Sequence, residues 1–168
     1  MKYLIGLLIM AISSISSAQT ISDYIRNDWP DSRYMVHGDG TVTDNKTKLM
    51  WKVCSEGQTW SSPATCSGSA TQHNWQQALA LADSASFASF NDWRLPNIAE
   101  LRSLAAKDRY NPAINAAVFP NTPSEWFWSS SLYANISAYA WIVNFNNGYD
   151  YGYHRSNPGR VRLVRAGQ

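Results

Sequence analysis

Apolar side chains recur at helical spacing in two parts of the chain. The first set predicts a helix that begins near Asn74 and buries one stripe of side chains, namely Trp75, Ala78, Leu79 and Ala82. A second helix is expected to start at Pro96-Asn97, because Asn97 can accept from the free N–H groups of a first turn and Glu100 completes a capping box. Its buried stripe is Ile98, Leu101 and Ala105.

Most of the remaining chain has the pattern of strands. Short runs rich in β-branched and aromatic residues are separated by Gly, Asn and Asp. Between Arg33 and Val53 these runs predict a small hairpin region, with extended segments at 34–36, 41–43 and 49–51. Further strands are expected at Trp126–Ser130, Tyr139–Phe145, Tyr149–His154 and Arg160–Arg165.

The dipeptide Asn147-Gly148 predicts a two-residue type I′ turn between two of these strands. Such a turn pairs each tyrosine of the second strand with a residue of the first: Tyr149 with Asn146, Tyr151 with Asn144, and Tyr153 with Ile142. The opposite face then carries the apolar residues that point to the core, Trp141, Val143 and Phe145. Three tyrosines and two asparagines are therefore expected on an exposed face, where burial does not account for them.

The first residues of the chain resemble an export signal. Lys2 is followed by an apolar run from Tyr3 to Ile12 and by small residues before Gln19, which is typical of a cleaved signal peptide. We therefore expect a signal peptide at 1–18, an N-terminal lead-in at 19–32, and one domain at 33–168. The expected location is the periplasm or the outside of the cell.

The charge and hydropathy of the chain argue against nucleic-acid binding and against a membrane span. Without Lys2, 13 of the 14 basic side chains remain against 12 acidic ones, so the mature chain is nearly neutral and offers no general attraction to nucleic acid. No segment approaches the roughly 20 apolar residues that span a bilayer. We expect neither nucleic-acid binding nor a membrane span in the mature chain.

Two cysteines, Cys54 and Cys66, are present. In an exported chain an even pair is most simply a disulfide, because the compartment is oxidising. A redox role or a metal site is the weaker interpretation, since the further Cys or His ligands of a zinc site are missing at the usual spacing.

Five segments in order resemble the Lcl C-terminal domain family: 39–51 (DGTVTDNKTKLMW), 91–97 (NDWRLPN) followed by Glu100-Leu101, 127–130 (FWSS), 140–145 (AWIVNF) with Gly148, and 161–165 (VRLVR). The resemblance implies an α+β, C-type-lectin-like fold in an exported bacterial protein, with two main helices packed on twisted antiparallel strands and hairpins. The family includes the C-terminal domain of a collagen-like adhesin that binds sulfated polysaccharides. This chain contains no Gly-X-Y collagen stalk.

The expected exposed face has the chemistry of a polysaccharide-binding surface. Aromatic rings can contact the apolar face of a pyranose, while amides contact its hydroxyls. The candidate ligand-binding residues on this face are Asn144, Asn146, Tyr149, Tyr151 and Tyr153. The alternative is that another strand or a partner subunit covers this face.

Arginines near the C-terminus suggest that the glycan could be sulfated, because guanidinium groups suit sulfate and carboxylate. The candidates are Arg155, Arg160 and Arg162, with Arg160 and Arg162 on one face of the last predicted strand. The alternative is that these arginines are solvated or pair with Asp150, Asp92 or Glu125. Arg94 is expected to pair with a carboxylate such as Asp92.

Catalytic and metal motifs are not found. The chain has no Gly-x-Ser-x-Gly elbow and no His-Glu-x-x-His motif, and its acidic residues do not follow the EF-hand spacing. We therefore expect a non-catalytic module that needs no cofactor or metal. The alternatives to glycan binding are a protein-interaction or diversified display module on a lectin-like scaffold, and a structural role in an envelope assembly.

Overall fold

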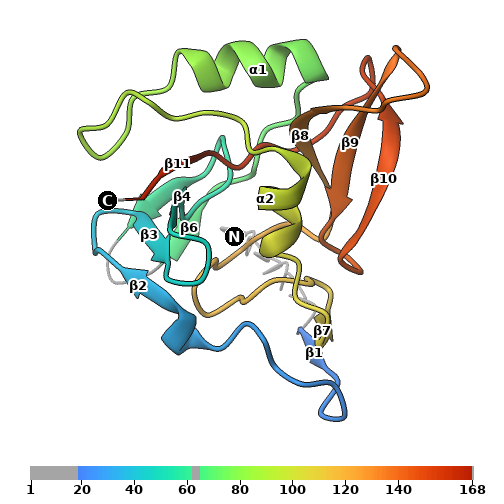
Figure 1. The fold of residues 1–168 in the computed structure, drawn as a ribbon. Helices are drawn as coiled ribbons and strands as arrows, with labels where there is room; N and C mark the ends of the chain where they lie inside the picture. Colours follow the sequence, from blue (N-terminus) through green and yellow to red (C-terminus); the bar gives the residue numbers. More distant parts are fainter. Residues whose placement is uncertain (1–18, 62–64, 168) are drawn as a thin grey trace, which may run out of the picture.

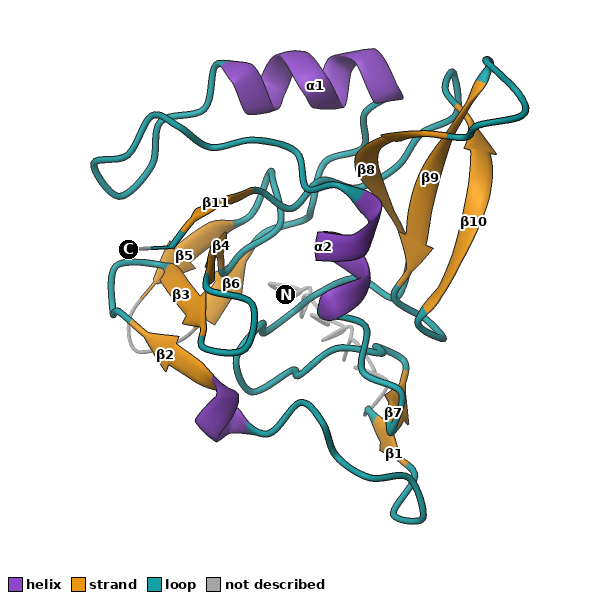
Figure 2. Cartoon of the chain, viewed as in Figure 1, coloured by secondary structure: helices purple, strands orange, loops and turns teal. Residues whose placement is uncertain are grey.

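The computed structural model describes residues 19–61 and 65–167, and the predicted signal peptide lies outside the described residues. Within these ranges the chain forms two α-helices, a 3₁₀ helix at Asp31–Arg33 and four small antiparallel sheets (Figures 1 and 2). Helix α2 lies between the two larger sheets, and α1 lies across one end of the molecule (Figure 1). No helix in the described ranges is long and apolar enough to cross a membrane.

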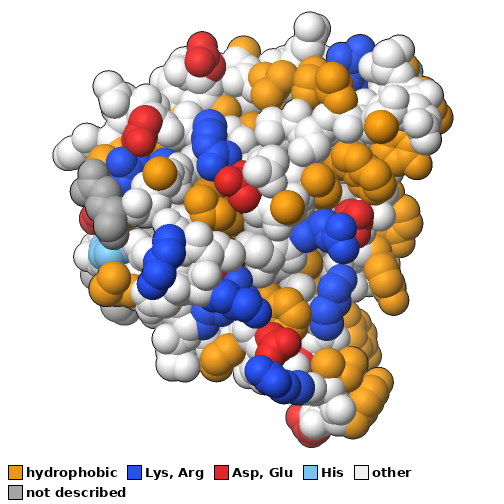
Figure 3. All heavy atoms as spheres, in the orientation of Figure 1, with side chains coloured by type: hydrophobic (Ala, Val, Ile, Leu, Met, Phe, Trp, Pro, Cys, Tyr) orange, Lys and Arg blue, Asp and Glu red, His pale blue; other side chains and the backbone are white. Residues whose placement is uncertain are grey.

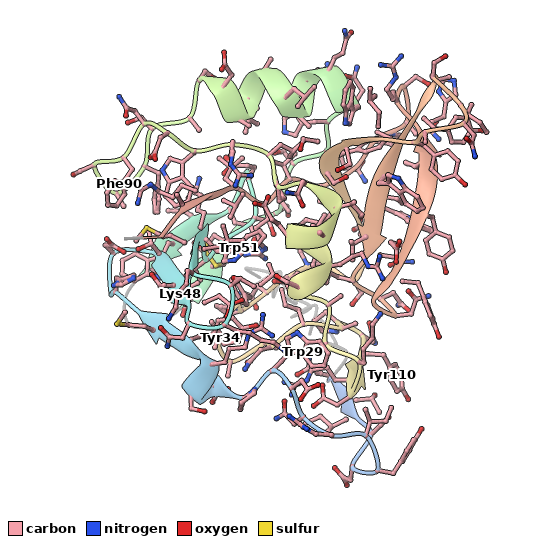
Figure 4. All side chains as sticks on the ribbon, in the orientation of Figure 1. Trp29, Tyr34, Lys48, Trp51, Phe90 and Tyr110 are labelled. Carbon is pink, nitrogen blue, oxygen red and sulfur yellow. A yellow bond between two sulfur atoms is a disulfide. The ribbon has the colours of Figure 1, made fainter. Side chains whose placement is uncertain are left out.

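One of the larger sheets has four strands in the order β11-β4-β3-β2. These strands are β2 (Tyr34–Val36), β3 (Thr41–Asp44), β4 (Leu49–Lys52) and β11 (Val164–Ala166). The inner strand β4 is buried on both faces, because Met50 and Trp51 are both buried and belong to different core clusters. Trp51 points into the middle of the molecule (Figure 4).

The other larger sheet has three strands in the order β10-β9-β8. They are β8 (Trp126–Leu132), β9 (Tyr139–Asn144) and β10 (Tyr149–His154). Successive side chains of a strand point to opposite faces. Val143 belongs to the same core cluster as Trp51, whereas Ile142 belongs to the cluster that contains Met50. The strands therefore separate two halves of the core, and β10 forms a free edge of its sheet.

Both predicted helices are present. Helix α1 (Trp75–Asp83) is capped by Asn74, whose side chain accepts from the N–H of Gln77. Helix α2 (Ile98–Ser103) has the predicted capping box, in which Asn97 accepts from the Glu100 N–H and Glu100 accepts from the Asn97 N–H. The predicted stripes face the core, with Trp75, Ala78, Ala82, Leu101 and Ala105 buried and Leu79 and Ile98 partly buried.

Four short strands were not predicted. They are β1 (Thr20–Ile21) with β7 (Arg109–Tyr110), and β5 (Thr59–Ser61) with β6 (Thr65–Ser67). Strands of two or three residues are too short to show an alternating pattern. The predicted disulfide between Cys54 and Cys66 is confirmed, and it is fully buried.

The predicted strand at Arg160–Arg165 is wrong for its first four residues. Only Val164–Ala166 forms β11. The segment before it changes hydrogen-bond partners from residue to residue. The Arg160 N–H donates to the carbonyl of Trp126, whereas the Leu163 carbonyl accepts from the Lys52 N–H. This segment therefore passes from the three-stranded sheet to the four-stranded sheet, and it forms no continuous ladder with either.

Candidate functional site

The β9–β10 hairpin differs from the predicted register by two residues. Tyr149 pairs with Asn144, Tyr151 with Ile142 and Tyr153 with Ala140, so the turn has four residues, 145–148. Gly148 has a positive φ of 76°, but Asn147 is not among the residues with positive φ, which a type I′ turn would require. A shift of two residues keeps every side chain on its predicted face.

Phe145 accounts for the longer turn. Its ring is fully buried against Phe127, and its backbone binds the Glu125 carbonyl and the Ala113 N–H instead of continuing the hairpin ladder. Two asparagines then close the turn through their side chains. Asn144 Oδ1 accepts from the Asn146 N–H at 2.9 Å, and Asn147 Oδ1 accepts from the Tyr149 N–H at 3.1 Å.

The predicted tyrosine face is exposed at one end and half-buried at the other. Tyr149 and Tyr151 are 59% and 41% exposed. Tyr153 is half-buried and packs against Trp126 and Trp128, with ring centroids 5.6 Å and 5.5 Å away. The expectation of an exposed face is therefore met by the first two tyrosines and is wrong for Tyr153.

Trp126 joins this surface although sequence reasoning did not select it. It pairs with Asn144 across the sheet, and its half-buried ring lies 5.3 Å from Tyr151 and stacks on Tyr153 with an interplanar angle of 9°. The sequence signal that could have found Trp126 is the alternation of the predicted strand 126–130. It did not suffice, because the register of this strand against β9 could not be assigned from the sequence. We call the set Trp126, Tyr149, Tyr151 and Tyr153 the aromatic platform.

The aromatic platform lies on one face of the sheet and runs across it from the edge strand β10 to Trp126 on β8. Figure 3 shows hydrophobic side chains gathered along the side where Figure 1 places β10. The Asn111 N–H donates to the Asn146 carbonyl, so Tyr110, which is also exposed, lies close to the hairpin turn (Figure 4). Asn146 is exposed at this turn, and Asn144 is half-buried.

A lysine adjoins the platform at Tyr149. Lys107 Nζ donates to the Gly148 carbonyl at 2.5 Å and lies 5.2 Å from the centre of the Tyr149 ring. Burial and the nearby Arg102 lower the pKa of Lys107. Arg102 itself is 3.3 Å from Asp150, so this end of the platform carries both signs of charge.

The predicted arginines do not form one exposed cluster. Arg160 donates from Nε and Nη2 to the two carboxylate oxygens of Glu125 at 3.0 and 2.9 Å, and it also donates to the Ala70 carbonyl. Arg155 lies 5.2 Å over the ring of Trp75 and lines a small cavity of about 250 Å³ with Asn74, Gln76 and Ser156. Pairing with a carboxylate therefore describes Arg160 correctly.

Arg162 is a core residue, which corrects its assignment to an exposed strand face. Its side chain is fully buried near the rings of Phe119 and Phe127, with distances of 4.9 and 5.9 Å to the ring centres. Its Nη2 donates to Thr122 Oγ1 at 2.7 Å, and its Nη1 donates to the Val53 carbonyl. Burial lowers the pKa of this guanidinium to about 9. Arg162 cannot reach a ligand on the surface.

Arg94 pairs with a carboxylate as expected, but its partner is Glu100 and not Asp92. Arg94 binds Glu100 through two hydrogen bonds of 2.7 Å, whereas Asp92 binds Arg165. The Arg94–Glu100 contact attaches the start of α2 to the preceding loop. The Asp92–Arg165 contact attaches the same loop to β11. In the part of the chain that the structure describes, no group of three or more His, Cys, Asp or Glu side chains could hold a metal ion.

The comparison with known families agrees with the five segments noted in the sequence. No curated protein matches the chain. The model of the Lcl C-terminal domain matches residues 40–165, which include β3, both helices and the whole β8–β10 sheet. The chain therefore belongs to the Lcl C-terminal domain family.

Proposed function

We propose that this protein is an exported, non-catalytic module that binds a polysaccharide through the aromatic platform. The observation that carries the proposal is the exposure of Tyr149 and Tyr151 on a free edge strand, next to the ring of Trp126. Large exposed aromatic rings that a core does not require are typical of recognition surfaces.

The arrangement suits a sugar chain because it combines flat apolar surface with polar groups at its borders. Trp126 and Tyr151 offer ring faces and edges for the C–H groups of pyranose rings. The exposed Asn146 and the tyrosine hydroxyls can bind sugar hydroxyls. Because the platform runs across the sheet from β10 to β8, it can contact several consecutive sugars.

The family and the fold add support. The adhesin domain that resembles this chain binds polysaccharides, and we propose that both share a C-type-lectin-like fold, since this chain also places two helices against small antiparallel sheets and hairpins. The buried disulfide suits an oxidising compartment, which supports export.

The test is a glycan-array screen of the oxidised chain that begins at Gln19. We expect selective glycan binding that the double variant Tyr149→Ala/Tyr151→Ala loses while its unfolding transition stays cooperative. Tyr24→Ala is the matched control, because Tyr24 is 90% exposed and lies outside the platform. Binding that survives in the double variant would contradict the proposal.

The alternative proposal is a protein-interaction or display module that uses the same surface. The exposed mixture of Tyr149, Tyr151, Asn146 and Asn147 is also the composition of antibody paratopes. A silent glycan array together with platform-dependent binding of a protein would favour this alternative.

A further inference from the structure

We propose that the ligand-binding surface extends from the aromatic platform past the hairpin turn to Tyr110 on β7, and that it holds an internal stretch of a linear polysaccharide. This inference rests on the proposed function and specifies a further contact residue and the form of the ligand. It follows from the attachment of the segment 107–113 to the turn and from the exposure of the rings on both sides of that turn.

The segment 107–113 runs beside the hairpin turn and is fixed to it. Three hydrogen bonds join the two parts: from the Asn111 N–H to the Asn146 carbonyl at 2.8 Å, from the Ala113 N–H to the Phe145 carbonyl at 2.6 Å, and from Lys107 Nζ to the Gly148 carbonyl. Tyr110 belongs to this segment. The same hydrogen bonds therefore set its position relative to Tyr149, which follows the turn directly.

Strand β7 presents the ring of Tyr110 to solvent. Successive side chains of a strand point to opposite faces. Arg109 is buried, where it donates to the two carboxylate oxygens of Asp108 at 2.9 and 2.7 Å, whereas Tyr110 is 48% exposed. The buried ion pair therefore holds β7 in the fold and leaves the Tyr110 ring outside the core. An exposed ring that the core does not use is available to a ligand.

Tyr110 extends the exposed rings along one side of the molecule. Tyr151 and Tyr149 lie on one face of β10, about 7 Å apart along the strand, and the turn and Tyr110 come next. Figure 3 shows hydrophobic side chains that continue down this side, and Figure 4 places Tyr110 near its lower end. Asn146 is exposed at the turn, where its amide can bind the hydroxyls of a sugar that passes from Tyr149 to Tyr110.

The exposed tyrosines do not line a pocket, which favours an internal stretch of a chain over its terminal sugar. Recognition of a terminal sugar requires a concave site that encloses it. Cavities of about 250, 290 and 470 Å³ are present in the structure, but none of these three is lined by Tyr110, Tyr149 or Tyr151. Rings that follow one another along an exposed side can instead contact consecutive sugars of a chain that continues beyond them.

Contacts in a row make the affinity depend on chain length. The loss of translational and rotational freedom opposes binding once for each ligand molecule, whereas each further sugar adds a contact. A chain long enough to reach from Tyr151 to Tyr110 should therefore bind more tightly than a shorter chain of the same sugar. Tyr110 should contribute to the affinity of the longer chain only.

The experiment uses size-defined oligosaccharides of two to twelve sugars from chitin, β-glucan, alginate and chondroitin sulfate, which include neutral, carboxylated and sulfated chains. Calorimetric titration of the oxidised chain that begins at Gln19 gives the Kd of each oligosaccharide. For at least one series we expect Kd to fall at least tenfold between four and ten sugars. Chemical modification of the non-reducing terminal sugar of the longest member should change its Kd less than twofold.

Variants of Tyr110 test its part in this length dependence. Tyr110→Ala should weaken binding of the longest oligosaccharide at least fivefold and that of the four-sugar member less than twofold. Tyr110→Phe keeps the ring and should stay within twofold of the wild type for both. Met35→Ala is the matched control, because Met35 is 50% exposed on β2 of the other larger sheet.

The outcomes separate this inference from the proposed function. Loss of binding in Tyr149→Ala/Tyr151→Ala, together with unchanged binding of the longest chain in Tyr110→Ala, would overturn the inference and leave the proposed function intact. A Kd that does not depend on chain length, or binding that is abolished by modification of the terminal sugar, would also overturn it. If none of these series binds and the glycan array is silent, the proposed function fails together with the inference.

Discussion

Tyr151 and Tyr153 point to the same side of β10, but only Tyr153 packs against two tryptophans. We expect Tyr153→Ala to lower the free energy of unfolding by about 2–3 kcal/mol, because it removes stacked aromatic contacts over a buried surface. Tyr151→Ala should cost about 1 kcal/mol or less, since this ring is 41% exposed and has one aromatic neighbour, Trp126. Urea denaturation of both variants measures the difference.

Phenylalanine substitutions provide the control for this comparison. Tyr151→Phe and Tyr153→Phe keep both rings, so each should stay close to the wild type in stability. Equal losses in the two alanine variants would show that Tyr151 is as much a part of the core as Tyr153.

Asp44 is a buried carboxylate whose ionisation is coupled to folding. Burial opposes its negative charge, but the hydrogen bonds from Arg33, from the Lys46 N–H and from Thr47 outweigh that effect, so the pKa of Asp44 lies below its usual value. Because the unfolded chain binds a proton at higher pH than the folded chain, this stabilisation is complete above about pH 4. It is lost as the pH falls through the lower pKa of the folded state.

We therefore expect Asp44→Asn to cost about 3–5 kcal/mol at pH 7, because Arg33 is left buried without its counter-charge. The difference from the wild type should shrink between pH 4 and pH 2, where the wild type loses the same interaction. Guanidinium denaturation across this range measures it. Asp83→Asn, at an exposed residue near the end of α1, should run parallel to the wild type.

At the scale of elements, local signals predicted the helices well. The side chains of Asn97 and Glu100 each accept from the other's backbone N–H, and the two residues are three positions apart. The cap of α2 can therefore be predicted from the sequence alone. The β9–β10 turn depends instead on the burial of Phe145 against a strand that comes earlier in the chain. No local pattern reports that contact, and the predicted register was therefore wrong. The predicted alternation was kept, but Trp141, expected in the core, is half-buried, and Ile142, expected on the exposed face, is fully buried.

The candidate site shows the same difference between local patterns, which the sequence contains, and contacts between distant residues, which it does not reveal. Alternation along β10 placed the three tyrosines on one face, but the exposure of Tyr151 and the partial burial of Tyr153 depend on Trp126 and Trp128 from another strand. Arg162 is the clearest error. A guanidinium in a core requires carbonyl and hydroxyl partners from residues 40 to 110 positions away, which spacing along the sequence cannot reveal.

The hairpin turn gives a prediction at this scale. Gly148 is buried with φ of +76°, and a Cβ there would lie 3.3 Å from the Ala113 Cβ. Gly38 has a similar φ of +78° but open space around it. In both alanine variants the left-handed backbone should lower the free energy of unfolding by about 1–2 kcal/mol. Crowding should lower that of Gly148→Ala by about 1 kcal/mol more. Thermal unfolding compares them, and equal losses would rule out tight packing under the turn.

At the scale of the whole molecule, the core consists of two clusters. The disulfide belongs to one of them, and the candidate site packs against the other. The disulfide and the four-stranded sheet contribute to the cluster around Trp51, Leu101 and Phe127. The half-buried rings of Trp126 and Tyr153 pack against the other cluster. Changes at the disulfide should therefore affect folding more than ligand binding.

The variant Cys54→Ala/Cys66→Ala tests this separation. The bridge closes a loop over a sequence separation of 12, so its loss should lower the free energy of unfolding by about 3 kcal/mol in the chain-entropy model. The folded fraction of the variant should bind the polysaccharide with a Kd within twofold of the wild type, because neither cysteine belongs to the aromatic platform. Calorimetric titration below the unfolding transition measures this Kd. A tenfold weaker affinity in a fully folded sample would show that the two halves of the core are coupled through the strands between them.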